Sequence, residues 1–200
     1  MPTELLLVRH GQTDWNLTHR IQGSVDIPLN ATGVAQAEAT RDAFRNRTFD
    51  AIVSSQLERA VFTADAINAP HGRPQRIDAR LAERAHGTYE GWTVQEIIAE
   101  IGEGNEDAFF QQSPALEPWP AVTERVLSAL REIALEYSGG TIVVVAHGGS
   151  IRAAVAAMQS VHHRSIAGLS NCSITTVQFD DDWTVVDYND NRHLPTELRT

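Results

Sequence analysis

The chain has 200 residues and contains no lysine, so its 16 basic side chains are all arginines, set against 26 aspartates and glutamates. This composition excludes enzymes that need a lysine amine: Schiff-base and pyridoxal-phosphate enzymes, Walker A nucleotide-binding proteins, protein kinases and SxxK hydrolases. The formal net charge of −10 argues against sequence-independent nucleic-acid binding, which needs a broad cationic surface. We therefore expect no nucleic-acid partner, and an anion must bind at a local arginine cluster.

Length and the lack of targeting signals favour a single domain over residues 1–200. The N-terminus lacks the basic and apolar regions of a secretory signal, and no apolar run approaches the roughly 18 residues of a membrane span. We therefore expect a cytoplasmic protein with no membrane partner. The single cysteine, Cys172, excludes an internal disulfide and is expected to be a small buried residue. Oligomeric state is not readable, which leaves a homodimer open.

The N-terminal half alternates short apolar runs with amphipathic segments. Residues 5–8 predict a buried strand, and a helix follows at 33–46. Residues 51–53 predict a second strand, which leads into a helix at 57–68. A further short strand is expected shortly before Leu81. Continuous apolar strands between amphipathic helices are typical of a parallel sheet that is covered on both faces.

The C-terminal half repeats this pattern after an irregular stretch. Around residues 90–120 the pattern loosens into short helical pieces with glycines and prolines, which we interpret as a lid insertion. The elements expected after it are a helix at 120–137, a strand at 141–146 (TIVVVA), a helix at 150–159 capped by Ser150, and a strand pair at 173–179 and 184–188. The sequence therefore predicts a three-layer α/β/α fold with a mostly parallel central sheet.

Two of the predicted strands end in the same dipeptide, His-Gly. In open α/β sheets, ligands bind beyond the carboxyl ends of the strands, where His10 and His147 are expected. Arg9 precedes the first histidine, and Arg59 lies in the first turn of the helix at 57–68. Glycine allows a close backbone approach, helix N-termini attract anions, and arginine binds phosphate oxygens in pairs. These residues predict a compact cationic pocket for a tetrahedral dianion.

A metal site is the alternative for the same histidines. Zinc could be bound by His10 and His147 with Glu83 or Asp26 as a third ligand. The neighbouring arginines would repel a cation and have no lone pair to donate, so we expect no metal and no cofactor. A bound phosphate leaves one histidine free to attack phosphorus.

Covalent chemistry on a histidine also needs a neutral imidazole and a carboxylic acid. Adjacent guanidinium groups favour the neutral imidazole because they lower its pKa. The acid must protonate the leaving oxygen and then take a proton from water. Glu83, in a loop after the short strand, is the candidate, and a solvated carboxylate paired with Arg84 is the alternative interpretation.

An ordered set of motifs resembles the histidine phosphatase superfamily, the phosphoglycerate mutase-like fold. Residues 9–16 (RHGQTDWN) resemble its RHG signature. The further matching positions follow in the expected order and are Gln22-Gly23, Asp26 to Leu29, Thr32-Gly33, Gln36-Ala37, Ser54-Ser55, Leu57, Arg59-Ala60, Thr63-Ala64, Leu81, Glu83, Gly87, Glu90-Gly91, His147-Gly148, Asn189 and His193-Leu194. The resemblance extends over essentially the whole chain.

This resemblance implies a role for each matching residue. His10 would be the phosphorylated nucleophile, Glu83 the proton donor, and Arg9, Arg59 and His147 the groups that hold the phosphoryl oxygens. His147 would be charged or hydrogen-bonded rather than nucleophilic. The implied substrate-binding residues are Asn16, Gln22, Gly23 and Gly148. One departure concerns the lid, because many relatives carry Gly-Glu-Ser where this chain has Leu116-Glu117-Pro118.

The resemblance leaves several activities open. A metal-independent phosphatase acting on small-molecule phosphate monoesters is favoured, because residues 85–124 contain no basic residue except His86, and a mutase must clamp a second phosphate. Phosphoglycerate mutase-type transfer, a protein-directed phosphohistidine phosphatase and a catalytically silent phospho-ligand-binding domain are the alternatives. The acidic lid suggests a neutral, apolar or ammonium-bearing leaving group. The alternative is a carboxylate that meets Arg20 and Arg84, if these side chains point inward. The candidate cleft walls are Trp15, Tyr89, Trp92, Phe109, Phe110 and Trp119, and the candidate rim residue is His86.

Overall fold

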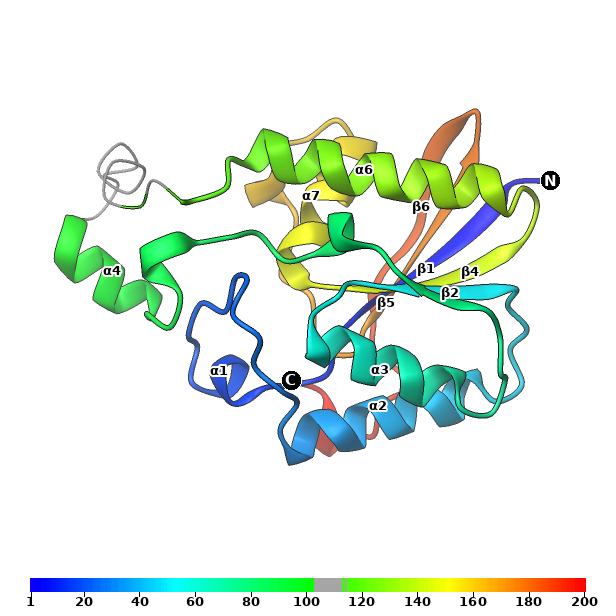
Figure 1. Ribbon diagram of the computed structural model, residues 1–200, viewed down its shortest axis with the longest axis horizontal. Helices are drawn as coiled ribbons and strands as arrows, with labels where there is room; N and C mark the ends of the chain where they lie inside the picture. Colours follow the sequence, from blue (N-terminus) through cyan, green and yellow to red (C-terminus); the bar gives the residue numbers. More distant parts are fainter. Residues whose placement is uncertain (103–112, 114) are drawn as a thin grey trace.

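A computed structural model describes residues 1–102, 113 and 115–200, and its centre is a six-stranded sheet with the order β3-β2-β4-β1-β5-β6 (Figure 1). The parallel strands are β1 (Thr3–Arg9), β2 (Ala51–Ser54), β3 (Gln75–Ile77) and β4 (Thr141–Ala146). The antiparallel strands are β5 (Ile174–Asp180) and β6 (Asp182–Asp190). The predicted mostly parallel α/β sheet is confirmed.

Helices cover both faces of this sheet, which gives three layers (Figure 1). One face carries α2 (Ala31–Phe44) and α3 (Glu58–Asn68), and the other carries α6 (Trp119–Glu136) and α7 (Gly148–Met158). Successive side chains of a strand point to opposite faces. In β1, Leu5 and Leu7 accordingly belong to the core cluster under α6 and α7, whereas Leu6 and Val8 belong to the cluster with α2 and α3.

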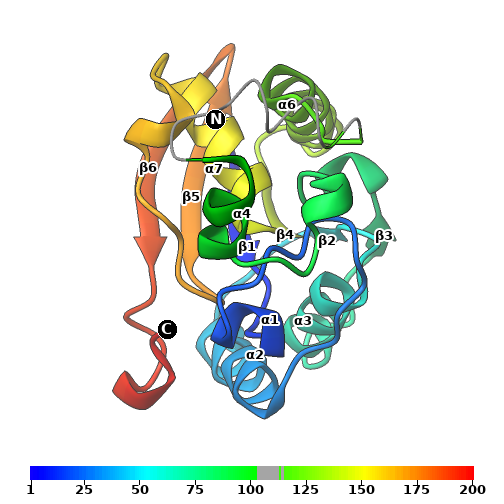
Figure 2. The same ribbon diagram turned by 90° about the vertical axis from the view of Figure 1, so that its left-hand side faces the viewer.

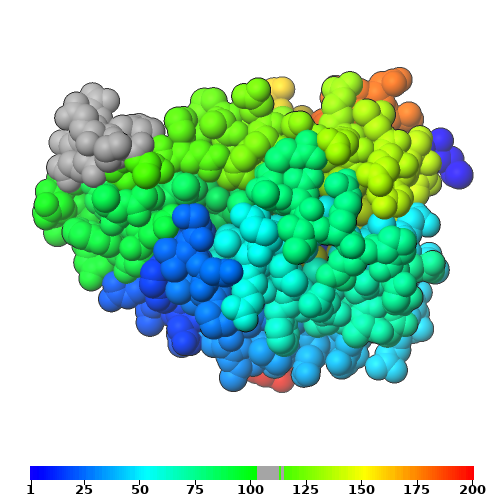
Figure 3. Space-filling view, in the orientation of Figure 1, coloured from blue at the N-terminus to red at the C-terminus, as the bar shows by residue number. Residues whose placement is uncertain are grey.

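Shorter elements lie beyond the carboxyl ends of the central strands. These are α1 (Asp14–Leu17) and α4 (Val94–Ile101), which lie in front of the sheet when the molecule is viewed from that side (Figure 2). The segment around α4 forms this end of the molecule in the space-filling view (Figure 3). Of the predicted lid at 90–120, residues 103–112 and 114 lie outside the described residues. Within the described residues, no helix is long and apolar enough to cross a membrane.

Short 3₁₀ helices lie in several of the remaining connections, namely η1 (Ala79–Leu81), η2 (Gly87–Tyr89), η3 (His163–Ser165) and η4 (Thr196–Leu198).

The expectation that Ser150 caps the helix after β4 is wrong. α7 begins at Gly148 with His147 as its N-cap, and the Ser150 Oγ accepts a hydrogen bond of 3.2 Å from the His147 amide. The helix starts earlier because this side chain closes its first turn.

The order of the strands decides which loops meet. The chain passes from β3 back into the sheet and inserts β4 between β2 and β1. Arg9 at the end of β1 is then paired with Ala146 at the end of β4. His10 and His147, which follow these residues, therefore leave the sheet side by side, at the point where ligands bind in open α/β sheets.

The loop after β1 packs directly against the first turn of α2. A Cβ atom added at Gly33 would lie 2.0 Å from the carbonyl oxygen of Gln12, which is main chain and cannot rotate away. Farther along α2, the Gln36 Oε1 accepts a hydrogen bond of 2.8 Å from the Gln12 amide. The helix thereby fixes the backbone that follows His10.

The contact between Gly33 and the Gln12 carbonyl predicts that alanine at position 33 destabilises the protein, although helix propensity alone predicts the opposite. Glycine to alanine in a helix normally stabilises by about 1 kcal/mol, but Gly33→Ala is expected to lower the free energy of unfolding by about 1–3 kcal/mol because it overpacks the loop. Urea denaturation measures the change. The control is Glu38→Ala at an exposed position of the same helix, where a change within about 0.5 kcal/mol is expected. A stabilised Gly33→Ala protein would contradict the packing argument.

Candidate active site

The two histidines predicted for the site lie against each other. The ring centroids of His10 and His147 are 5.1 Å apart and the ring planes are tilted by 57°. Both side chains are buried, with exposed fractions of 3% and 0%. The pairing of β1 with β4 thus brings together residues that are far apart in the sequence.

The orientation of the His10 ring identifies its reactive nitrogen. Its Nδ1 lies 2.7 Å from the carbonyl oxygen of Gly11. A carbonyl oxygen only accepts hydrogen bonds, so Nδ1 carries the proton and Nε2 retains the lone pair. Burial lowers the pKa of His10 well below 6.5, and the charges of Arg59 and Arg9 lower it further. The ring is therefore neutral at neutral pH, with an unprotonated Nε2.

Two arginines accompany the histidines, Arg59, which is buried, and Arg9, which is half-buried. The Arg59 guanidinium donates hydrogen bonds of 2.8 Å to the Val25 carbonyl and 2.9 Å to the Gly23 carbonyl, and the Arg9 Nη1 donates to the Leu169 carbonyl. Within the part of the chain that the structure describes, the Nε atom of each arginine is buried without a hydrogen-bond partner. Burial lowers the pKa of both groups. An anion would satisfy these donors.

Glu83 is held by two main-chain amides. Its Oε1 accepts a hydrogen bond of 2.8 Å from the Arg84 amide, and its Oε2 accepts one of 2.9 Å from the Gly149 amide in the first turn of α7. A Cβ atom at Gly149 would lie 2.3 Å from Oε1, so only glycine leaves room for the carboxylate. The guanidinium of Arg84 instead donates from Nε to the Glu117 carbonyl at 2.7 Å. Glu83 is thus a positioned carboxylate and not a loop residue paired with the Arg84 side chain.

The segment that departs from the family pattern supports the Glu83 loop. Arg125 donates to the Glu117 carboxylate from Nε at 2.6 Å and from Nη2 at 2.8 Å. The same guanidinium donates to the Ala82 carbonyl at 2.8 Å and to the Glu83 carbonyl at 3.2 Å. A bidentate ion pair of this kind has a fixed geometry. Glu117, the glutamate that the departure retains, therefore fixes the backbone on both sides of Glu83.

A cavity of about 220 Å³ lies between these groups. Of the predicted site residues, its wall includes Arg9, His10, Asn16, Gln22, Gly23, Arg59 and Glu83. The anticipated His86 and Trp119 also line it, whereas Phe109 and Phe110 lie outside the described residues. The wall is completed by Arg20, Ile21, Arg84, Gly149 and Arg152.

Two predicted residues are placed differently from the expectation. Gly149, and not Gly148, contributes to the cavity wall. His147 touches His10, but both of its ring nitrogens are buried without a partner among the described residues. Burial, and then the charges of His10 and Arg59, lower the pKa of His147 well below 6.5. The resemblance implied a charged or hydrogen-bonded His147, and in the protein alone the lowered pKa favours the neutral form.

Sequence reasoning missed Arg152. It lies three residues after Gly149 on α7, so both residues occupy the same face of the helix. The three-residue spacing between Gly149 and Arg152 was the sequence signal from which Arg152 could have been predicted. The cavity wall thus carries five arginines, namely Arg9, Arg20, Arg59, Arg84 and Arg152. Among the residues that the structure describes, the carboxylate in the same wall is that of Glu83.

Asn171 connects the nucleophile loop to other parts of the site. Its Nδ2 donates to the His10 carbonyl at 3.0 Å and to the Asn16 Oδ1 at 3.3 Å. Its own Oδ1 accepts a hydrogen bond of 3.4 Å from the Thr200 Oγ1. This buried amide, which sequence reasoning also missed, positions His10 and Asn16 relative to each other.

Asp26, the other metal ligand considered from the sequence, has a structural role here. Its Oδ1 accepts a hydrogen bond of 2.8 Å from the Glu58 amide at the start of α3, and it does not line the cavity. Among the described residues there is no group of three or more histidine, cysteine, aspartate or glutamate side chains that could hold a metal ion.

The two buried histidines predict a pH-dependent stability. Their pKa values are lowered on folding, so below pH 6.5 the unfolded chain binds protons that the folded protein does not. The free energy of unfolding should therefore fall as the pH falls from about 7.5, by up to about 1.4 kcal/mol per pH unit for each histidine. His147→Gln should remove one such contribution, which urea denaturation at several pH values measures.

The exposed His19 provides the control, since His19→Gln leaves the buried pair intact. A slope that His147→Gln does not flatten relative to this control would contradict the lowered pKa of His147.

Comparisons with known proteins match this arrangement. The model of the histidine phosphatase superfamily (branch 1) matches residues 5–191. The chain is 34% identical over 194 residues to the uncharacterized phosphatase PhoE of Bacillus subtilis (strain 168), covering 96% of this chain and 97% of that protein. It is 33% identical over 201 residues to a metal-independent phosphoserine phosphatase of Arabidopsis thaliana, and the match covers 96% of this chain and 83% of that protein.

A solved structure extends the match to the fold. Phosphoserine phosphatase from Entamoeba histolytica, in complex with 3-phosphoglyceric acid, superposes with a TM-score of 0.83 at 28% identity and covers 96% of this chain and 100% of that one. The family match, the named phosphatases and the shared fold agree with the paired histidines, arginines and carboxylate of the cavity. The chain therefore belongs to the histidine phosphatase superfamily, branch 1, and is an enzyme of the phosphate monoester hydrolase class.

Proposed function

We propose that this enzyme is a metal-independent phosphatase that hydrolyses small-molecule phosphate monoesters through a phosphohistidine intermediate on His10. The observation that carries the proposal is the hydrogen bond between the His10 Nδ1 and the Gly11 carbonyl. It leaves Nε2 as the nucleophile in a cavity that also contains two arginines with unpartnered Nε atoms. Metal independence is supported by the excess of cationic groups, which would repel a metal ion, and by the name of the Arabidopsis relative.

In the first step, the His10 Nε2 forms a bond to phosphorus while the bond from phosphorus to the leaving oxygen breaks. Arg9 and Arg59 spread the charge of the three phosphoryl oxygens, which favours a loose transition state. Glu83, in its protonated form, gives its proton to the leaving alcohol. The products of this step are the free alcohol, the Glu83 carboxylate and phosphorylated His10.

In the second step, water attacks phosphorus on the opposite side from Nε2. Glu83 takes a proton from this water as the bond between phosphorus and nitrogen breaks, so inorganic phosphate leaves and both residues return to their starting states. The amides of Arg84 and Gly149 hold the carboxylate in one place during both transfers. No group outside the chain is needed to balance protons or electrons.

The wall of the cavity changes the expectation of a neutral leaving group. Arg84 and Arg152 line it, and burial lowers the pKa of Arg84 to about 10. The Arg152 Nε is buried without a partner in the described part of the chain. Such cations favour a second anionic group on the substrate. We therefore propose phosphorylated carboxylic acids as the preferred class, which agrees with the phosphoserine and 3-phosphoglyceric acid named for the relatives.

The first test measures phosphate release from phosphoserine with and without EDTA. We expect activity to survive the chelator, His10→Ala to abolish it, and Glu83→Gln to lower kcat by about 10²–10⁴-fold, the usual contribution of general acid and base catalysis. Trapping the wild-type enzyme in acid-free denaturant should show phosphorus bound to histidine by ³¹P NMR. Loss of activity in EDTA, or full activity of His10→Ala, would contradict the mechanism.

The same NMR assay separates hydrolysis from mutase-type transfer. With 3-phosphoglycerate as substrate, a phosphatase accumulates inorganic phosphate, whereas a mutase accumulates 2-phosphoglycerate. We expect inorganic phosphate as the main product.

A second prediction tests the carboxylate class with a matched pair of substrates. Phosphoethanolamine is phosphoserine without its carboxylate. Arg152→Leu should lower kcat/KM for phosphoserine by about 10–100-fold, the loss of one charge-assisted hydrogen bond, and should change kcat/KM for phosphoethanolamine less than about threefold. Arg73→Leu, at an exposed position, is the control variant. Equal losses on both substrates would show that Arg152 does not recognise a carboxylate.

A further inference from the structure

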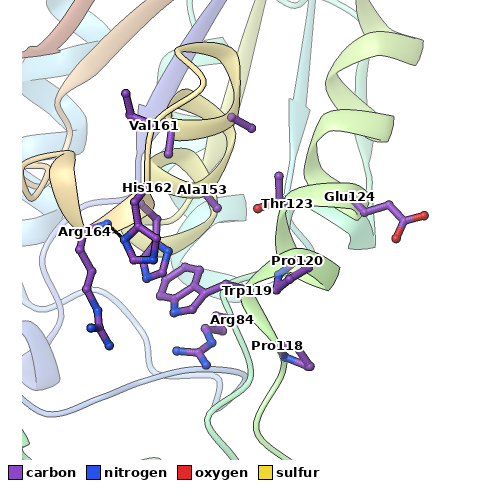
Figure 4. Close-up of a pocket in the computed structure, with 13 residues that line it drawn as sticks. Arg84, Pro118, Trp119, Pro120, Thr123, Glu124, Ala153, Val161, His162 and Arg164 are labelled. Atoms are coloured by element: carbon purple, nitrogen blue, oxygen red, sulfur yellow. Dashed lines mark hydrogen bonds between the residues drawn. The ribbon is translucent and has the colours of Figure 1, made fainter. Parts of the chain in front are cut away.

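A second, larger pocket lies beside the catalytic cavity. Its volume is about 680 Å³, against about 220 Å³ for the cavity. It lies between the first turns of α6, one face of α7 and the segment of residues 161–164 (Figure 4). Two of its residues, Arg84 and Trp119, also line the catalytic cavity. The two spaces therefore share one wall.

Small side chains leave this space between the helices. On α7 the facing residues are Ala153, Ala156 and Ala157, which follow the three- and four-residue spacing of one helix face. Across from them, the start of α6 contributes Pro118 and Pro120. Alanine methyl groups and proline rings are too short to fill the gap, and their surfaces are apolar. The floor of the pocket thus suits an apolar group.

The shared wall is an ordered stack of rings and a cation. The Trp119 ring lies between His162 and Arg84 in Figure 4. Its centroid is 4.2 Å from that of His163 with an interplanar angle of 28°, and the Arg84 guanidinium lies 4.4 Å from the Trp119 ring. Stacking and cation–π contacts of this kind hold an indole in place and cover its two faces. The stack is therefore a fixed wall between the two spaces, and the alanine and proline surfaces form the apolar part of the pocket.

We propose that this alanine-floored pocket is a subsite for the leaving group of extended substrates, and that it takes a bulky apolar group attached to the phosphate-bearing part. The proposal rests on the proposed function, because it assigns the phosphate to the His10 cavity. The apolar group passes Arg84 and Trp119 at the shared wall and lies on Ala153 and Ala157. Compounds without such a group occupy the catalytic cavity alone.

The test compares two non-hydrolysable ligands by isothermal titration calorimetry. Methylphosphonate carries only the phosphate-like head, and 1-naphthylmethylphosphonate adds a fused aromatic ring. The wild-type enzyme should bind the naphthyl compound at least about tenfold more tightly, equivalent to about 1.4 kcal/mol. Ala157→Phe, which fills the pocket from α7, should remove this advantage and change the Kd of methylphosphonate less than about twofold.

A second variant that fills the pocket keeps the test decisive when Ala157→Phe does not fold. Val161 is an exposed lining residue just after the end of α7, so Val161→Trp narrows the same space without replacing a core residue. Ala69→Phe, at an exposed position at the end of α3, is the control for adding an aromatic ring elsewhere and should bind like the wild type. Equal binding of both phosphonates to the wild-type enzyme, or an unchanged naphthyl advantage in both filled variants, would overturn the subsite.

The calorimetry also separates the subsite from the proposed reaction. Failure to release phosphate from monoesters would overturn the proposed function, whereas the binding difference between the two phosphonates does not depend on turnover. A naphthyl advantage that both filling variants abolish supports the subsite whatever the rate of hydrolysis.

Discussion

Positive charge clustered beside two buried histidines is the constraint on which the site depends. Arg59 is buried and Arg9 is half-buried, and the nearby carboxylate of Glu83 accepts its hydrogen bonds from main-chain amides. Burying a charge without a partner is costly. The carbonyl oxygens of Gly23 and Val25 accept hydrogen bonds from the Arg59 guanidinium, and that of Leu169 accepts one from Arg9. These bonds use part of the donors of each guanidinium and orient it. The protein thus keeps a cationic cavity that a phosphate dianion completes.

The same constraint explains the state of the histidines. A protonated imidazole beside two guanidinium groups would add charge to an already cationic and buried space, so the pKa values of His10 and His147 fall. The hydrogen bond to the Gly11 carbonyl then decides which nitrogen of His10 holds the lone pair. Burial, charge repulsion and one main-chain contact together produce a neutral, oriented imidazole at His10, the residue that we propose as the nucleophile.

The supporting structure is mostly backbone. Glycines at positions 33 and 149 allow main chain or carboxylate to approach where any side chain would collide. The Glu117–Arg125 pair fixes the loop around Glu83, and Asn171 joins His10 to Asn16. The chain's lack of lysine fits this design, because a planar guanidinium can bridge a carboxylate and several carbonyl oxygens at once, as Arg125 does.

The sequence by itself determined the alternation of strands and helices, because apolar runs and helical periodicity are local properties. It also proposed His10, Glu83, His147, Arg9 and Arg59 as candidate site residues, since each follows a strand, begins a helix or matches a motif of the family. Arg152 and Asn171 were not predicted as site residues, because their contacts join segments that are far apart in the chain. The sequence also could not show that α7 begins at Gly148, because the hydrogen bond that the Ser150 Oγ accepts from the His147 amide decided it.

The tertiary structure alone decided the surroundings of the phosphate pocket. Counting basic residues in the lid segment suggested a neutral leaving group, whereas the folded cavity receives Arg20 from the loop after β1, Arg84 from the Glu83 loop and Arg152 from α7. Charge along a segment says little about charge around a cavity, because a cavity wall is assembled from several segments. Only the insertion of β4 between β1 and β2 brings those segments to one place.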